Sequence, residues 1–189
     1  MSARTAALLL AVLCAACTHT AKDASIIRGL SGPPKLYTLT NLHAFVDRVY
    51  AANFQSEVLI PVCSEVELLR YRTPPRAFMT FRVVATDKEY EYDDHGAAGE
   101  PLFDHLALYF GRDCPQARLD ALTTDERKAV SEGVVRPGMR KDAVILAIGY
   151  PPKASTASLE SKRWQYWHDR WKKFFVDFDD AGVVAKIEG

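Results

Sequence analysis

Apolar and polar residues alternate through much of the stretch from residue 36 to residue 92, which is the pattern of β-strands. The alternation is clearest over residues 65–68, 77–85 and 89–92, and a Thr-Pro-Pro sequence at residues 73–75 turns the chain between the first two. Short strands joined by tight turns predict a small β-barrel or a curled sheet.

The spacing changes after a polar loop that follows these strands. Apolar residues recur at helical intervals over residues 102–110. Thr124, followed by two acidic residues and closed by Gly133, has the cap and charge pattern of a second helix. A third helix is predicted over residues 139–148, and it should end at Gly149 with a positive φ angle.

The last part of the chain alternates again. The alternating sets are Trp164, Tyr166 and His168, then Phe174, Val176 and Phe178, then Val183, Ala185 and Ile187 after a tight turn. This pattern predicts a three-stranded antiparallel meander. We therefore predict an α+β fold in two parts: a β-rich domain over residues 36–96, and a helical lead-in with an α+β domain over residues 97–189.

Five short motifs punctuate the last third of the chain: Gly138-Met139-x-x-x-x-Val144, Ile148-Gly149-x-Pro151, Trp164-x-Tyr166, Val176-x-Phe178 and Gly182-Val183. Together they resemble the SmpA/OmlA family. Its members are small outer-membrane lipoproteins, including the small lipoprotein of the β-barrel assembly machinery. Their fold is similar to the repeat of β-lactamase inhibitor protein, and the resemblance implies that fold for the C-terminal part. The motifs are structural signatures and contain no active-site residues.

A narrower likeness includes the N-terminal part. Residues 149–152, 158–161 and 164–167 resemble a group of bacterial lipoproteins that place a β-rich part before this same tail. In that group the β-rich part looks like an SH3-like barrel, so the resemblance implies such a barrel here. Val62-Cys63-Ser64 departs from the pattern, because a Gly-Thr turn is usual at that place.

Residues 1–16 have the features of a signal peptide, with an apolar run shorter than the ~20 residues that span a bilayer. Ala15-Ala16-Cys17 resembles a bacterial lipobox, which implies cleavage before Cys17 and a lipid on its sulfur. Cys14 stands where leucine is usual, and ordinary secretory cleavage is the alternative. Thr18 replaces the aspartate that retains some lipoproteins in the inner membrane, so we expect anchoring at the periplasmic face of the outer membrane.

Residues 17–35 are mostly small and polar and contain a Pro-Pro pair. They are predicted to form a tether between the lipid and the folded part, flexible at first and stiffer at the prolines. The alternative is that Ile26 and Ile27 pack on the domain. The full chain has 24 basic and 24 acidic residues, and no basic patch has the density that nucleic acid requires. We therefore expect a membrane contact through the lipid and no nucleic-acid partner.

No set of residues forms a recognisable catalytic or cofactor site. His95 and His105 each lie near an aspartate, but neither has the ligand spacing of a metal site, and a solvated loop is expected for both. Ser155, Ser158 and Ser161 lack a glycine elbow, and no phosphate-binding glycine loop occurs. We expect no enzyme activity, no metal and no cofactor.

The cysteines indicate the compartment. Cys14 leaves with the signal peptide and Cys17 is used if it carries a lipid, so Cys63 and Cys114 remain as an even pair. A chain bound for an oxidising compartment favours a disulfide between them. The alternative is two unpaired cysteines, one of them packed as a small apolar group.

Aromatic residues gather in the meander, where such a run is more often a sheet core than a binding surface. Trp171 lies between Arg170 and Lys172-Lys173 at a turn, which is a poor place for a core ring. Trp167 and Trp171 are therefore the candidate partner-binding residues.

These features predict a non-catalytic envelope lipoprotein that acts as a protein-binding or assembly module at the outer membrane. The alternatives are a module that binds peptidoglycan or lipid through its N-terminal part, and an envelope-remodelling enzyme with an unrecognised site. An enzyme would show convergent polar residues in one pocket. A wall binder would show an aromatic groove on the N-terminal part, and an assembly module would show an apolar patch on the meander.

Overall fold

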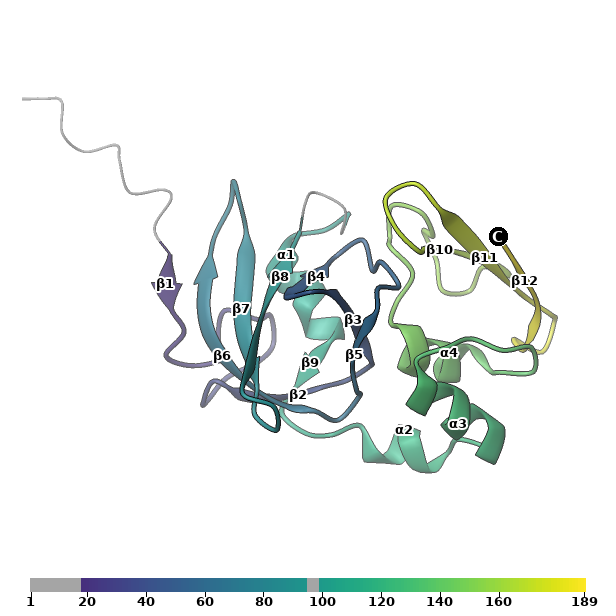
Figure 1. Ribbon diagram of the computed structural model, residues 1–189, viewed down its shortest axis with the longest axis horizontal. Helices are drawn as coiled ribbons and strands as arrows, with labels where there is room; N and C mark the ends of the chain where they lie inside the picture. The colour runs from purple at the N-terminus through teal and green to yellow at the C-terminus, as the bar shows by residue number, and fades with distance from the viewer. Residues whose placement is uncertain (1–17, 95–98) are drawn as a thin grey trace, which may run out of the picture.

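The computed structural model describes residues 18–94 and 99–189 and shows a mixed α+β fold made mostly of sheet (Figure 1). A curled nine-stranded sheet and a three-stranded antiparallel sheet are accompanied by four short α-helices. The predicted α+β class and the curled sheet are confirmed at this level. The signal peptide (residues 1–16), Cys17 and His95 lie outside the described residues.

The curled sheet contains β1 (His19–Thr20), β2 (Lys35–Thr38), β3 (Leu42–Phe45), β4 (Arg48–Tyr50), β5 (Val58–Ile60), β6 (Glu65–Arg72), β7 (Phe78–Val83), β8 (Lys88–Asp93) and β9 (Phe110–Gly111). Its strands follow the order β5-β3-β4-β8-β7-β6-β2-β9, and β1 is added along β6. β4 and β8 run parallel, and the other pairs are antiparallel. The longest strands, β6, β7 and β8, therefore lie side by side within the sheet.

Alternation along these strands sends one set of side chains into a shared core. Met79, Phe81 and Val83 of β7 are buried, and so are Tyr90 and Tyr92 of β8. The rings of Phe81 and Tyr90 stack across the hairpin with centroids 5.7 Å apart. Such cross-strand pairs stabilise a sheet. The strands predicted from the alternation over residues 77–85 and 89–92 are present as β7 and β8.

The first compact part extends beyond the predicted boundary at residue 96. α1 (Leu102–His105) and a 3-10 turn (Leu106–Leu108) pack against the curled sheet, and β9 pairs with β2 at its edge. Phe110 is buried in the same core. The helix predicted over residues 102–110 is shorter than expected, because its end is drawn into the sheet as a strand.

Residues 18–34 do not form the flexible tether that their composition predicted. β1 pairs with the end of β6, and both Ala24 and Ile27 are completely buried. The amide of Arg28 donates to the carbonyl of Phe103 at 3.2 Å. The few apolar residues of this segment fit onto the core of the curled sheet, and their burial offsets the entropy lost on ordering it. The described fold thus begins at Thr18.

The remaining helices connect the two sheets: α2 (Gln116–Asp120), α3 (Thr124–Glu132) and α4 (Lys141–Ile148). Every residue of α4 from Ala143 to Ile148 is buried. This helix starts two residues later than predicted, because the carbonyl of Met139 accepts a hydrogen bond from the amide of Val184 at 2.8 Å. The start of the predicted helix is therefore paired with the meander. Across residues 18–94 and 99–189, every helix is too short or too polar to cross a bilayer.

α3 begins with a capping box, a reciprocal pair of hydrogen bonds at a helix start. The hydroxyl of Thr123 accepts from the amide of Glu126 at 3.2 Å, and the Glu126 carboxylate accepts from the amide of Thr123 at 3.0 Å. The cap is thus Thr123 and not Thr124, because only Thr123 has a glutamate three residues later. Gly133 closes the helix at φ 66°, as predicted.

Gly149 ends α4 at φ +76° and ψ −175°, so the predicted positive φ is confirmed. A Cβ at this position would lie 3.0 Å from Nδ2 of Asn53 and 3.1 Å from Cε1 of Tyr109. Both the backbone angle and the close neighbours therefore favour glycine.

The meander consists of β10 (Arg163–Trp167), β11 (Lys173–Phe178) and β12 (Val184–Glu188), as an antiparallel sheet of three strands. Its inner face contains Trp164, Tyr166 and Val176, which are fully buried in one core with α4. The last strand begins one residue later than expected. The register shifts between Asp177 and Phe178, and Val184 becomes its buried residue.

Candidate functional site

A disulfide joins the curled sheet to the helical region. Cys63 lies just before β6, and Cys114 lies between β9 and α2, with their Cα atoms 4.8 Å apart. This geometry confirms the predicted pair.

Asn41 is a central polar contact between the two parts and is 1% exposed. Its Nδ2 donates to the carbonyl of Val130 in α3 at 2.6 Å and to that of Ala147 in α4 at 2.9 Å. Its Oδ1 accepts from the amide of Val62 at 2.7 Å. The last carbonyls of a helix have no partner within it, and Asn41 supplies a donor to one carbonyl in each helix. Sequence reasoning missed this residue, because an asparagine in a β-rich stretch also fits a turn.

Asn53 makes a second contact of this kind. Its Nδ2 donates to the carbonyls of Ile148 and Tyr150, each at 2.7 Å. Gln55 adds a hydrogen bond from Nε2 to the Ile148 carbonyl at 3.2 Å. The β-rich part therefore holds the C-terminal end of α4, and together with the disulfide these contacts make the two parts one body.

Trp167 belongs partly to this junction. Its carbonyl accepts a hydrogen bond from the amide of Gln55 at 2.9 Å, and its backbone forms an isolated parallel β-bridge with Phe54. The indole Nε1 donates to the hydroxyl of Ser155 at 3.3 Å. The ring is half-buried, and these internal contacts make Trp167 the weaker of the two predicted partner-binding residues.

Trp171 is 85% exposed at the turn between β10 and β11. The turn is nevertheless ordered, because Oδ1 of Asp169 accepts from the amides of Trp171 and Lys172 at 2.7 and 2.9 Å. These two hydrogen bonds lower the pKa of Asp169. Arg170 and Lys172 are exposed on either side of the ring. The structure thus brings one large apolar ring and several cations together on a fixed turn.

A buried polar cluster surrounds His105, which is 3% exposed. Its Nδ1 lies 3.2 Å from a carboxylate oxygen of Glu100, and its Nε2 lies 3.1 Å from the hydroxyl of Tyr92. The other carboxylate oxygen of Glu100 accepts from Nζ of Lys153 at 3.2 Å. The expectation of a solvated loop is therefore wrong for His105, because α1 places this side chain under β8.

The electrostatics of this cluster follow from its burial. Burial lowers the pKa of His105, although the hydrogen bond that His105 donates to Glu100 opposes the change. Burial alone would raise the pKa of Glu100, but hydrogen bonds from His105 and Lys153 bring it below its usual value. Burial also raises the pKa of the Tyr92 hydroxyl. Both ring nitrogens of His105 already have partners, so the imidazole offers no free nitrogen to a substrate.

A cavity of about 230 Å³ opens beside this cluster, with Glu100, His105, Tyr150 and Lys153 in its lining. It is a place where polar residues converge, as expected of an enzyme, but its charged groups are bonded to one another. Ser155, Ser158 and Ser161 do not line this cavity, and Ser155 instead accepts from Trp167. Within the described parts of the chain, no group of three or more His, Cys, Asp and Glu side chains could hold a metal ion.

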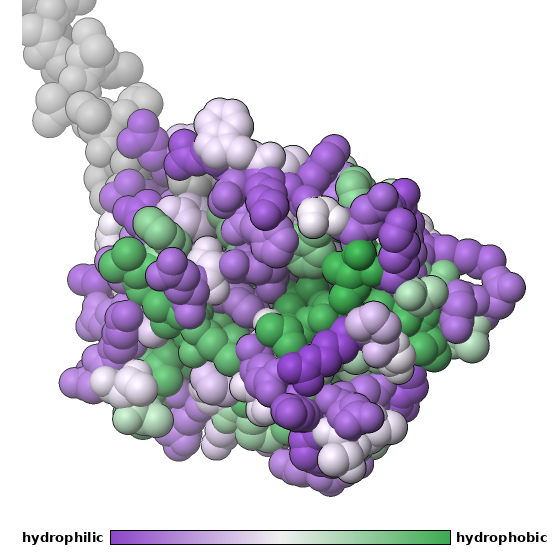
Figure 2. Space-filling model, turned by 45° about the vertical axis from the view of Figure 1, so that its right-hand side comes forward, coloured by the Kyte–Doolittle hydropathy of each residue, from purple (hydrophilic) through white to green (hydrophobic). Residues whose placement is uncertain are grey.

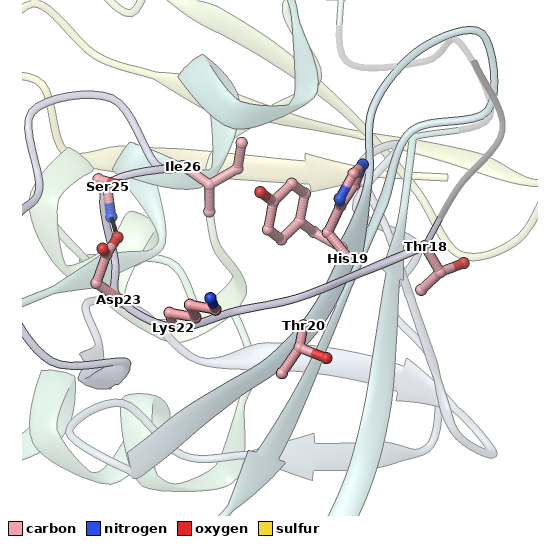
Figure 3. Close-up of a pocket in the computed structure, with 8 residues that line it drawn as sticks. Thr18, His19, Thr20, Lys22, Asp23, Ser25 and Ile26 are labelled. Carbon is pink, nitrogen blue, oxygen red and sulfur yellow. Dashed lines mark hydrogen bonds between the residues drawn. The ribbon is translucent and has the colours of Figure 1, made fainter. Parts of the chain in front are cut away.

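A second, more open cavity of about 510 Å³ lies at the start of the described chain (Figure 3). Residues 18–26 run around it, with His19 and Lys22 among its lining side chains. The ring of His19 stacks on Tyr71 of β6 with centroids 5.2 Å apart. This cavity is therefore built by the segment that follows Cys17.

In comparisons with known proteins, the chain matches no family model, no curated protein and no solved structure.

Proposed function

We propose that this chain is a non-catalytic protein-binding or assembly module, held at the periplasmic face of the outer membrane by a lipid on Cys17. The observation that carries the proposal is the open edge of the meander at β12. Residues 185–188 are all exposed, and β12 is the last strand of its sheet. Gly138 and Met139 occupy this edge at Val184, where they form two backbone hydrogen bonds of 2.8 Å, and beyond that residue no strand in the described parts of the chain pairs with it.

An open strand edge presents backbone N–H and C=O groups that can accept a strand from another chain. Along β12, Ile187 is 37% exposed between the exposed charges of Lys186 and Glu188. Charges at an edge limit indiscriminate pairing, so a partner has to match them. We therefore propose that an extended segment of an envelope protein adds to β12 and recognises its alternating charged and apolar side chains.

The face shown in Figure 2 gives further support. An apolar patch lies in the middle of this face and is bordered by polar side chains. An apolar centre with a polar rim is typical of protein–protein contact surfaces. Trp167, which is half-buried at the end of β10, is separately proposed as a partner contact.

The proposed absence of catalysis is supported by the state of the polar cluster. His105 has no free ring nitrogen, and its neighbour Glu100 is bonded on both oxygens. A general base needs to reach the proton that it removes. We assign this cluster a structural role beneath β8.

We also propose the relationships that the sequence motifs suggest. The order of α4 and the meander supports an SmpA/OmlA-like fold for the C-terminal part. The short, curled strands of the N-terminal part support an SH3-like barrel, which the added strands β1 and β9 would extend.

The edge is tested with a photo-crosslinking amino acid in place of Lys186 in the full chain in cells. Lys128, an exposed lysine on α3, is the matched control position. We expect a protein adduct from position 186 and none from position 128. The substitution Ile187→Lys should abolish the adduct, because lysine on an edge disfavours pairing. Identical adducts at both positions, or an adduct unaffected by Ile187→Lys, would show that β12 is not the binding edge.

The anchor is tested separately. Cys17→Ala should release the protein from the membrane fraction and abolish labelling by fatty acid. A variant that still sediments with membranes and still takes up the label would refute a lipid on Cys17.

A further inference from the structure

We infer that the molecule lies on the bilayer through the face that carries the β6–β7 turn and the β10–β11 turn, and that this face contacts anionic lipid headgroups. The inference rests on the proposed anchor at Cys17. It concerns a different surface from the β12 edge, so the two can succeed or fail independently.

The first observation is where the described chain begins. Thr18 follows Cys17 directly, and its hydroxyl accepts from Nη2 of Arg72 at 3.2 Å. His19 is paired with Tyr71, one residue before the end of β6. One residue spans at most about 3.6 Å. A lipid on Cys17 would therefore hold the end of β6 close to the headgroups.

The second observation is the position of the turns. In Figure 1 the tip of the β6–β7 hairpin and the turn between β10 and β11 both reach the upper edge of the molecule, whereas α3 lies at the lower edge. A flat surface that meets the hairpin tip on this side also meets the β10–β11 turn. The described chain begins at the left of this view, beside β6 and below the hairpin tip, so a lipid on Cys17 would lie next to the same hairpin.

The third observation is the chemistry of the two tips. Arg76 is exposed at the β6–β7 turn, and Arg170 and Lys172 are exposed at the β10–β11 turn. The guanidinium of Arg72 lies 5.1 Å from the centroid of the Phe78 ring.

The acidic residues near the hairpin tip are largely engaged. A cavity of about 650 Å³ beneath the tip is lined by Arg72 and Arg76 together with acidic residues, among them Asp94. Glu91 and Asp93 in this lining are ion-paired with Arg48 at 3.5 and 3.3 Å. Arg76, which is exposed at the tip, is therefore the cation of this lining that an anion can reach.

These groups fit the headgroup region of a bilayer. Indole rings are enriched at membrane interfaces, and Trp171 is 85% exposed beside two cations. Each Lys or Arg near an anionic surface strengthens binding about fivefold. The hydrogen bonds of Asp169 fix the turn beforehand, so little ordering is required when the ring enters the interface.

The charge contribution is tested on the exported full chain with Cys17→Ser, which lacks the atom that would carry the lipid. Binding is measured by sedimentation with vesicles of phosphatidylcholine, with and without phosphatidylserine. We expect binding to the anionic vesicles only, and Arg76→Ala and Arg170→Ala should each weaken it about fivefold. Lys128→Ala, which removes an exposed cation on α3 at the opposite edge, should leave binding unchanged.

Equal binding to both kinds of vesicle would overturn the inference, and so would an equal loss in Lys128→Ala and Arg76→Ala. The orientation is tested on the lipidated protein in the anionic vesicles. Lipids brominated on their acyl chains should quench the fluorescence of the wild type more than that of Trp171→Phe. Equal quenching in an anchored, fatty-acid-labelled protein would show that Trp171 faces away from the bilayer, as a protein partner would require. Failure of the labelling itself would instead refute the anchor.

Discussion

Both a positive φ angle and close neighbours favour glycine at position 149, whereas only the φ angle does so at position 138. Both glycines have positive φ angles, +76° and +91°, but nothing lies within 4 Å of a Cβ placed at Gly138. Gly149→Ala should lower the free energy of unfolding by more than roughly 1 kcal/mol, because it combines a disfavoured φ with contacts to Asn53 and Tyr109. Gly138→Ala should show the effect of the angle alone.

Chemical denaturation of the two variants beside the wild type measures both losses. Equal losses would show that Asn53 and Tyr109 move aside without cost. An unchanged stability in Gly149→Ala would contradict the positive φ itself.

Single residues were predictable where their own chemistry restricts them. Gly149 and the pair Cys63 and Cys114 belong to this class, because a positive φ favours glycine and the expectation of export leaves these two cysteines as one possible pair. Asn41 and His105 were not predictable. Their roles depend on carbonyls and rings that are far away in the sequence, such as Ala147 beside Asn41 and Tyr92 beside His105.

At the scale of elements, Glu126 joins the start of α3 to the start of α4. Besides Thr123, it accepts hydrogen bonds from the amide and the Nε of Arg140 at 3.0 and 2.9 Å. Hydrogen bonds from the Arg140 side chain are the main reason that the pKa of Glu126 falls from 4.5 to about 2. A carboxyl whose pKa is lower in the folded state stabilises the fold above its unfolded pKa.

The stability from Glu126 should therefore be complete above about pH 4.5 and disappear as the pH falls towards 2. Glu126→Gln should flatten this part of the stability curve, measured by urea denaturation at a series of pH values. Glu132→Gln, at the exposed end of the same helix, is the matched control and should leave the slope unchanged. A wild-type slope in Glu126→Gln would assign the acid sensitivity to other groups.

Elements were predictable in proportion to their length and regularity. α4 and the strands of the meander have clear periodicities, and their errors are confined to one or two residues at their ends. β3 and β4 have four and three residues, and β9 has two. Such segments carry too few alternations for a period to be recognised, and tertiary pairing alone decides that they are strands. The segment at residues 18–34 was predicted to be a tether from its composition. Composition alone does not show that a few apolar residues can pack on a neighbouring core.

At the scale of the whole molecule, the disulfide closes a loop between residues 51 positions apart. Its removal in the double variant Cys63→Ala/Cys114→Ala should lower stability by roughly 4 kcal/mol in the chain-entropy model. Asn41 and Asn53 still connect the two parts in that variant, so a single cooperative transition is expected at lower denaturant concentration. Two separate transitions would show that the cysteines alone hold the parts together, and two free thiols in the unreduced wild type would refute the bond.

The packing of residues 18–34 onto the curled sheet has a consequence for how such a protein would meet its partners. A lipoprotein with a long flexible linker samples a large volume of the periplasm and can reach the cell wall. If a lipid anchors Cys17, almost no free linker separates it from the fold, because Thr18 accepts a hydrogen bond from Arg72 and His19 pairs with Tyr71. The proposed binding edge would then lie at a fixed distance from the bilayer. Encounters would then occur by lateral diffusion within the membrane plane, with components that share that membrane. Only partners whose binding segment lies at that height above the lipid could then bind.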